Sequence, residues 1–154
     1  MAIRNIVKEG DERLAKVCRP VEKFDRHLEE LVHDMKDTLK LAEGLGLAAP
    51  QVGILRRVVV VVDDNGKMFE LINPEIVEAV GEQEAHEGCL SIPGVFGVTR
   101  RPERVTVRAK NVKGEDVQYT REGITAVCFC HELDHLDGIL FRTHVEHYLD
   151  PDED

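Results

Sequence analysis

The chain has 154 residues, with 42% hydrophobic and 32% charged side chains, and a chain of this length buries about 70% of its unfolded surface without disulfides. Its formal net charge of −10 argues against a surface that binds nucleic acid, and no apolar run reaches the ~18 residues that a membrane span needs. We therefore expect one globular domain over residues 1–154, with neither nucleic acid nor a membrane as a partner.

The first residues favour a cytoplasmic protein, and this location in turn suggests the state of the cysteines. Residues 1–6 lack the apolar core of a signal peptide. Cysteines in such a chain are more often thiols or metal ligands than disulfides, and there are four: Cys18, Cys89, Cys128 and Cys130. At the other end, residues 148–154 are acidic, and we expect them to form a frayed, solvated tail.

The first part of the chain predicts one long helix. Residues 11–17 suit a short helix that Pro20 prevents from continuing. Asp25 is the N-cap candidate for a longer helix over residues 26–43, and Gly44 supplies its end. The apolar side chains of this helix recur with the helical period and predict one buried face: Leu28, Leu31, Val32, Met35, Leu39 and Ala42.

A glycine-rich stretch follows over residues 44–53. Three glycines and two alanines in these ten residues let the backbone approach either another strand or a ligand closely. A phosphate-binding loop is disfavoured, because no strand precedes the stretch and no Lys-Ser or Lys-Thr pair follows it. A tight connection between helix and strand is an equally good interpretation.

Most of the remaining chain predicts strands. Residues 56–62 contain a β-branched run, residues 64–66 predict a hairpin turn, and residues 68–72 form the returning strand. Asn73 and Pro74 should end that strand. Further short strands are expected over residues 76–80, 83–87, 104–109 and 117–120.

The apolar run over residues 124–141 predicts a second helix, which begins at Gly123 and ends at Gly138. The order of elements is helix, many strands, and then this helix. It predicts an α+β fold, with antiparallel or mixed β-sheets packed around a central helix and an N-terminal helix beside them.

The central helix carries a metal-binding pattern. His131 and His135 are four residues apart, so they lie one above the other and are close enough to hold one cation. Glu132 leans toward the same ion without being placed to bind it, which suits a general base. The pattern HExxH also arises by chance, and a buried or solvated histidine pair is the alternative. The third ligand therefore decides the interpretation.

Cys89 is the strongest candidate for that third ligand. The extended zinc-protease pattern HExxHxxGxxH has Phe141 at its last ligand position, which weakens a metalloprotease interpretation, and His144 and His147 fall outside that spacing. Cys128 lies about 10 Å of helix rise from the second histidine, too far for one ion. Cys89 follows a strand at a bend, where a thiolate can point into a cleft. A His₂Cys set with an open fourth position is typical of catalysis; a buried apolar cysteine is the alternative.

Three motifs together resemble those of the peptide deformylase family. They are residues 44–51 (GLGLAAPQ), residues 87–91 (EGCLS) and residues 131–135 (HELDH). Their order and separation also match, and the similarity extends over residues 11–141. The resemblance implies removal of the formyl group from the N-formylmethionine of nascent polypeptides. It also implies Fe(II) as the usual native metal, with Zn or Ni as substitutes in purified protein.

The resemblance further implies the roles of individual residues. By motif position, the metal ligands are Cys89, His131 and His135. Glu132 would be the catalytic acid–base, and Gln51 would direct its amide at the developing oxyanion together with the backbone N–H of Leu90. A loop-bracing amide is the alternative role for Gln51. A metal-binding homologue without activity is a further alternative, but binding a metal needs neither Glu132 nor Gln51.

Specificity for methionine suggests an apolar pocket beside the metal. Its candidate walls, which could equally be ordinary core, are Leu45, Ile124, Val127 and Cys128. The peptide could add as an extra strand by main-chain hydrogen bonds. Its main-chain partners would then be Gly44, Gly46, Glu87 and Gly88. This mode reads no side chains, which suits an enzyme that must accept every nascent chain.

The chain departs from the commonest family pattern in places. Cys130 stands where glutamine often precedes the first histidine, and Val127 where arginine is frequent. Asp134 could orient a ligand histidine, pair with Arg101 or be solvated. The turn expected over residues 94–97 suggests a rim unlike that of members with arginine there. The basic C-terminal helix that docks some members on the ribosome is missing, so we expect ribosome contact to be transient at most.

Overall fold

The computed structural model describes residues 2–150 of the chain. Two α-helices and eight strands occur in this part, in the order η1 (Glu12–Ala15), α1 (Arg26–Ala42), β1 (Gly46–Ala48), η2 (Ala49–Val52), β2 (Val58–Val62), β3 (Met68–Val80), β4 (Gln83–Cys89), β5 (Ile92–Arg101), β6 (Arg104–Lys110), β7 (Asp116–Glu122), α2 (Gly123–Leu136), η3 (Phe141–His144) and β8 (His147–Tyr148). The elements labelled η are single 3₁₀ turns.

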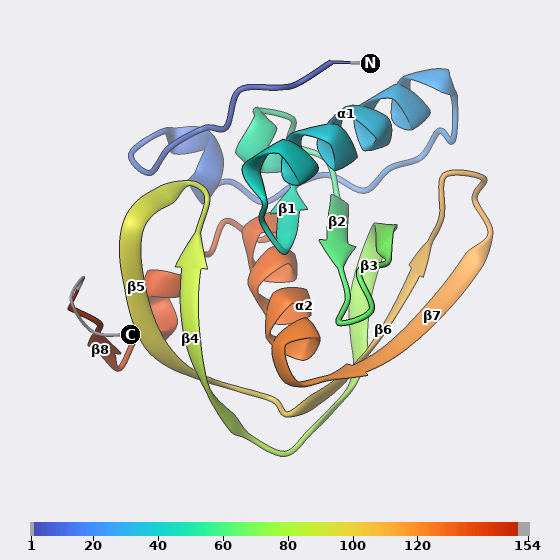
Figure 1. Ribbon diagram of the computed structural model, residues 1–154. Helices are drawn as coiled ribbons and strands as arrows, with labels where there is room; N and C mark the ends of the chain where they lie inside the picture. The colour runs from blue at the N-terminus through green and yellow to red at the C-terminus, as the bar shows by residue number, and fades with distance from the viewer. Residues whose placement is uncertain (1, 151–154) are drawn as a thin grey trace.

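Two antiparallel sheets lie on either side of α2. One has the strand order β1-β2-β3-β6-β7 and the other β4-β5-β8. Figure 1 shows α2 between them, with β4 and β5 on one side and β6 and β7 on the other. The helix contacts strands of both sheets. The predicted α+β fold with a central helix and an N-terminal helix is therefore confirmed.

Helix α1 begins where predicted but ends one residue early, at Ala42, and Glu43 instead of Gly44 adopts the left-handed conformation. The Asp25 side chain caps it by accepting a hydrogen bond from the Leu28 N–H at 3.1 Å, and the chain leaves the helix at Glu43, whose left-handed φ of 54° ends the regular turn. Its predicted apolar face is buried against β1 and β2, except for Ala42, which is exposed. The α1 side chains in this cluster are Leu28, Leu31, Val32, Met35 and Leu39.

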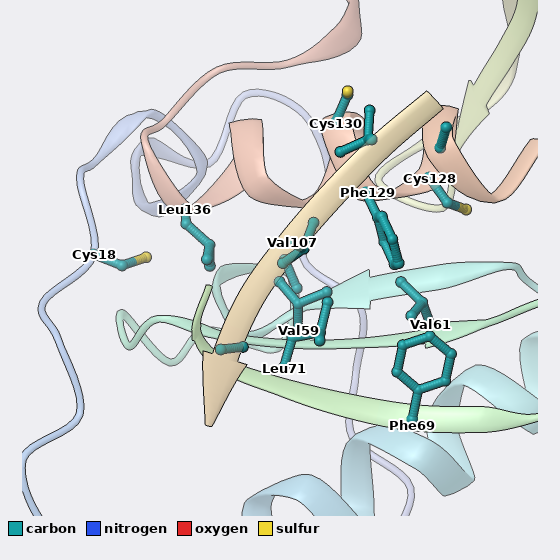
Figure 2. Close-up of a cluster of buried hydrophobic side chains, with 14 residues drawn as sticks. Cys18, Val59, Val61, Phe69, Leu71, Val107, Cys128, Phe129, Cys130 and Leu136 are labelled. Atoms are coloured by element: carbon teal, nitrogen blue, oxygen red, sulfur yellow. The ribbon is translucent and has the colours of Figure 1, made fainter. Parts of the chain in front are cut away.

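Helix α2 is buried on nearly all sides, and this burial restrains the positions of its side chains. Phe129 and Leu136 point into a cluster with Val59 and Val107 from the larger sheet (Figure 2). Burial of each such large apolar side chain stabilises the fold by about 1.5–3 kcal/mol. The helix ends at Leu136, and Gly138 lies so close to the first 3₁₀ turn that an added Cβ would meet the Ala15 carbonyl carbon at 2.6 Å.

Strand β3 does not end at Asn73 and Pro74, as the sequence had suggested. It continues to Val80, with one extra residue opposite β6 between Ile72 and Glu75. This bulge absorbs the proline, which cannot donate to the ladder. Asn73 adopts a left-handed φ of 52° and its side chain bonds the backbone N–H and C=O of Val21 at 2.8 and 2.9 Å.

Three other expectations were wrong in part. Residues 94–97 lie within β5 instead of forming a separate turn; residues 93–95 bulge from the register with β4. The helix expected over residues 11–17 is only the single turn η1. Tyr148, expected in a frayed tail, belongs to β8 and pairs with Gly97 of β5. Residues 151–154 of that tail lie outside the described part. Among residues 2–150, no helix is long and apolar enough to cross a membrane.

Candidate metal centre

Cys89, His131 and His135 meet at one point between the two sheets. Their possible ligand atoms all lie within 4.8 Å of one another, and Cys89 Sγ is 3.3 Å from His135 Nε2. The two imidazoles project from one face of α2, with ring centroids 5.1 Å apart. Cys89 is the last residue of β4, where the register with β5 shifts. This convergence was predicted from the sequence.

The spacing of these atoms fits a tetrahedral metal ion. Bonds of about 2.1 Å to nitrogen and 2.3 Å to sulfur place neighbouring donors about 3.4–3.6 Å apart. Among the described residues, the group contains three donors and no further His, Cys, Asp or Glu. Three protein donors leave a coordination position for water or substrate, as in catalytic metal sites.

The two histidines differ electrostatically. Burial, helped by the neighbouring His131, lowers the pKa of His135 to about 3, so its imidazole is neutral and has a lone pair to offer. Burial also opposes charge on His131, but Glu132, Cys89 and Glu87 outweigh it and raise the pKa of His131 to about 10. The surroundings of His131 therefore favour a positive charge at this point, which a bound cation can supply in place of the proton.

A buried carboxylate orients His131. Glu87 Oε1 lies 2.8 Å from His131 Nδ1, and Arg101 donates to both Glu87 oxygens at 2.7 and 3.0 Å. Thr99 also donates to this carboxylate. Burial opposes its charge, but the bonds to His131, Arg101 and Thr99 prevail and lower the pKa of Glu87 to about 2. Glu87 is thus an anion that accepts from Nδ1, which leaves Nε2 free for a metal.

Arg101 extends this network toward the surface. It donates to Asp134 Oδ2 at 2.9 Å, so of the alternatives for Asp134 the ion pair with Arg101 is observed. His144 is exposed, as expected, yet its Nε2 lies 3.2 Å from the same oxygen. Only a main-chain role was predicted for Glu87 from the sequence. Its position two residues before Cys89 was the available signal, because alternate residues of a strand face the same side.

Glu132 lies in the pocket beside the three donors. Its side chain is buried, its Oε1 has no hydrogen-bond partner among the described residues, and burial raises the pKa of its carboxyl to about 7. The backbone of Gly46 closes one side of the carboxyl group. A Cβ at Gly46 would lie only 2.6 Å from Glu132 Oε2. The glycine-rich stretch therefore approaches a catalytic candidate closely, and part of it is the strand β1.

Gln51 is 1% exposed and lies in η2, directly after β1. Its Oε1 accepts a hydrogen bond from the Ala48 N–H at 2.9 Å. Its Nε2 donates to Ser91 Oγ at 3.1 Å and lies 3.5 Å from Cys89 Sγ. The amide thus faces the metal centre and also braces its loop. Ser91 belongs to the motif at residues 87–91, but no role was predicted for it from the sequence.

A pocket of about 480 Å³ opens onto this centre, a size typical of small-ligand sites. All eight predicted substrate-binding residues line it: Gly44, Leu45, Gly46, Glu87, Gly88, Ile124, Val127 and Cys128. Leu90 lines it as well, together with Gly94 and Phe96 of the expected rim and the unpredicted His86, Ile92 and Pro93. A larger open hollow of about 670 Å³ beside the start of α1 contains none of the predicted site residues.

The other cysteines are not part of the donor cluster. Cys128 lines the pocket one turn before His131, and burial raises the pKa of its thiol far above the usual range. Cys130, also on α2, packs in the hydrophobic core, where burial raises the pKa of its thiol to about 11. Both thiols therefore stay protonated near neutral pH, and Cys128 lies in the wall of the pocket, as expected.

Comparison with known proteins gives one consistent family. The model of the family described as "Polypeptide deformylase" matches residues 3–149. A peptide deformylase of Acetivibrio thermocellus is 53% identical over 153 residues, covering 99% of this chain and 89% of the relative. "Peptide deformylase 2" of Clostridium acetobutylicum is 51% identical over 150 residues, covering 97% and 99%.

Comparison with solved structures gives the same family. The peptide deformylase of Legionella pneumophila superposes with a TM-score of 0.90 at 45% identity, covering 94% of this chain and 86% of that one. The enzyme of Ehrlichia chaffeensis in complex with actinonin gives 0.91 at 36% identity, covering 95% and 90%. With a matching family model, relatives above 50% identity and the same fold, this chain belongs to the peptide deformylase family of enzymes.

Proposed function

We propose that this chain is a metal-dependent hydrolase that removes the formyl group from the N-formylmethionine of newly synthesised polypeptides. The reaction consumes one water molecule and yields formate and a free amino terminus. One observation carries the proposal: a buried carboxylate oxygen of Glu132, which has no hydrogen-bond partner among residues 2–150, lies beside a Cys-His-His donor set at the wall of a pocket of about 480 Å³.

Cys89, His131 and His135 would hold the metal. A divalent ion bound there polarises a carbonyl oxygen and lowers the pKa of a water molecule, so that the attacking group exists near neutral pH. We propose Fe(II) as the native ion, on the resemblance of the three motifs, with Zn or Ni as substitutes. A thiolate and two imidazoles suit all three metals.

Glu132 would move the proton. Its carboxylate takes a proton from the attacking water and delivers it to the nitrogen of the breaking formyl–nitrogen bond, so that the peptide leaves as an amine. Burial keeps the pKa of Glu132 near 7 without a metal, which suits a group that must both accept and release a proton.

Gln51 and Leu90 would stabilise the oxyanion that forms on the formyl oxygen. Gln51 Nε2 faces the donor cluster from η2, and Leu90 lies next to Cys89 in the wall of the pocket. An amide N–H from each would donate to the oxygen as its charge develops. Removing one such donor typically costs about 3–4 kcal/mol of transition-state stabilisation.

The substrate would bind between two strand edges. Strand β1 is an edge strand of the larger sheet, and β4 is an edge strand of the smaller sheet. A peptide can pair with these edges through main-chain hydrogen bonds at Gly44, Gly46, Glu87 and Gly88. Its methionine side chain would enter the pocket at Leu45, Ile124, Val127 and Cys128.

We further propose that the chain acts as one catalytic domain in the cytoplasm. Its partners would be N-formylmethionyl nascent peptides, with at most transient contact to the ribosome. The net charge of −10 supports this view, because it repels the phosphates of ribosomal RNA.

The test is formate release from a formyl-Met peptide by protein purified without oxygen, with metal analysis of the same sample. We expect one metal per chain and activity that Glu132→Gln abolishes while the metal stays bound. The same peptide without its formyl group should not be cleaved, which separates deformylation from proteolysis. An inactive, metal-loaded chain would refute the proposal.

A further inference from the structure

Ser91 takes no part in the reaction as proposed, yet it lies fully buried beside the pocket, with 0% of its surface exposed. It occupies the turn between β4 and β5. Its Oγ accepts a hydrogen bond from Gln51 Nε2 at 3.1 Å, and its backbone carbonyl accepts one from the Glu9 N–H at 2.8 Å. The second bond anchors the turn to the N-terminal segment, so the hydroxyl is held in place.

The hydroxyl of Ser91 affects the direction in which the Gln51 amide hydrogens point. The amide oxygen is fixed by the Ala48 N–H, so the nitrogen must face Ser91 and Cys89. That nitrogen carries two hydrogens that diverge from each other in the amide plane. Because Ser91 Oγ accepts one hydrogen, the other is directed toward Cys89 Sγ and the metal centre.

We propose that Ser91 is a positioning residue, which orients the Gln51 amide so that its second hydrogen points at the reacting carbonyl. The terminal torsion of a glutamine side chain has only a broad, shallow preference. Without the hydroxyl, only the bond from the Ala48 N–H restrains the amide plane, and the buried amide N–H loses a partner. This inference rests on the proposed function, because it assumes that Gln51 donates to the oxyanion.

The first test is a double-mutant cycle on the full-length, metal-loaded protein, with formate release from a formyl-Met peptide as the assay. We expect Ser91→Ala to lower kcat about tenfold, since a misdirected donor loses part of what a deleted one loses, and to leave KM and metal content unchanged. Gln51→Leu should lower kcat at least tenfold. In the Gln51→Leu background, Ser91→Ala should have little further effect. Equal losses in both backgrounds, or no loss in the wild-type background, would overturn the proposal.

Thr106→Val is the matched control. The Thr106 hydroxyl is also buried and also bonded, to Thr120 Oγ1 at 2.8 Å, but it lies outside the pocket. Removing it should leave kcat unchanged. If Thr106→Val lowered kcat as much as Ser91→Ala, the effect of Ser91 would be general destabilisation and the positioning role would be refuted.

A second test needs no catalysis. The chain has three glutamines, so their side-chain amides can be separated by ¹⁵N NMR. In the unchanged protein, the Gln51 amide hydrogens should exchange with solvent far more slowly than those of the exposed Gln118. Ser91→Ala should speed the exchange of Gln51 at least tenfold and leave Gln118 unchanged. Exchange of Gln51 as fast as that of Gln118 in the unchanged protein would overturn the proposal.

These outcomes separate the two proposals. A folded, metal-loaded wild-type chain that releases no formate refutes the proposed function. An active wild-type chain whose Ser91→Ala variant is equally active refutes only the role of Ser91.

Discussion

Glu87 on β4 and His131 on α2 are joined by a hydrogen bond of 2.8 Å, in which the Glu87 carboxylate accepts from the Nδ1–H of His131. Arg101 lies behind the carboxylate and holds both of its oxygens. These bonds hold the ring plane and keep a proton on Nδ1, so Nε2 is the nitrogen that can exchange its proton for a metal. Such partners of metal-binding histidines raise the affinity for the metal by restricting the ligand and increasing its basicity.

Glu87→Gln should therefore weaken metal binding. The amide can still accept from His131 but carries no charge, and its nitrogen faces the Arg101 guanidinium unfavourably. We expect the metal affinity to fall about 10- to 100-fold, measured by competition with a chelator of known affinity. Glu84→Gln is the control, because Glu84 lies on the same strand with its side chain 56% exposed. Equal affinities for both variants and the wild type would contradict this role of Glu87.

Gly46→Ala should damage catalysis more than folding. The added Cβ would lie 2.6 Å from Glu132 Oε2 and 2.8 Å from its Cγ, so the carboxylate must move. A displacement of about 1 Å at a catalytic group can cost about 100-fold in rate. We expect kcat to fall at least tenfold while the metal content stays at one per chain. Urea unfolding of the same variant checks that the fold is retained; normal kcat would show that Glu132 has room to adjust.

Local signals made much of this site predictable. The Asp25 cap and the apolar period gave the ends of α1, and the spacing of the two histidines placed both imidazoles on one face of α2. Cys89 followed from the failure of the alternatives and from its position at a strand end. The helix and histidine inferences depend on residues close in sequence, where the helical period applies directly, whereas Cys89 was reached by excluding the other candidates.

The contacts that depend on strand pairing were not predictable in the same way. Glu87 reaches Arg101 only because β4 and β5 pair, and β5 was missed because Gly94 and its neighbours resemble a turn. Asn73 and Pro74 resemble a strand end, but a bulge carries β3 past them. In both cases long-range pairing outweighed the local preference of the residues.

Phe129→Ala should destabilise the fold and loosen the metal centre with it. Phe129 lies on α2, two residues before His131. Its side chain is fully buried and packs edge-on against Phe69. Truncating such a ring costs about 3–5 kcal/mol of unfolding free energy, which urea denaturation measures. Val17→Ala, at a side chain that is 68% exposed, should change it by less than about 0.5 kcal/mol. A loss below 1 kcal/mol for Phe129→Ala would contradict the packing role.

Removing the metal should abolish activity without unfolding the chain. The three donors sit on α2 and the end of β4, and both elements are held by apolar clusters and strand pairing that do not involve the ion. The bound metal adds only its linkage free energy, about 2.7 kcal/mol when the free ion is at 100 times its Kd. We expect dialysis against a chelator to lower Tm by several degrees and to leave the far-UV circular dichroism unchanged. Loss of that spectrum would show that the site forms only with its ion.

The apolar pocket should select methionine at the first position of the substrate. Burying a methionine side chain contributes about 1.5–3 kcal/mol, so kcat/KM for formyl-Met peptides should exceed that for formyl-Ala peptides about 10- to 150-fold. Val127 lines the pocket one turn before His131, and Val127→Phe should fill part of the space. The variant should lose the preference for methionine while it still processes formyl-Ala peptides. Val80→Phe adds the same ring on β3, outside the pocket, and should keep the wild-type preference; equal selectivity in all three proteins would place the methionine elsewhere.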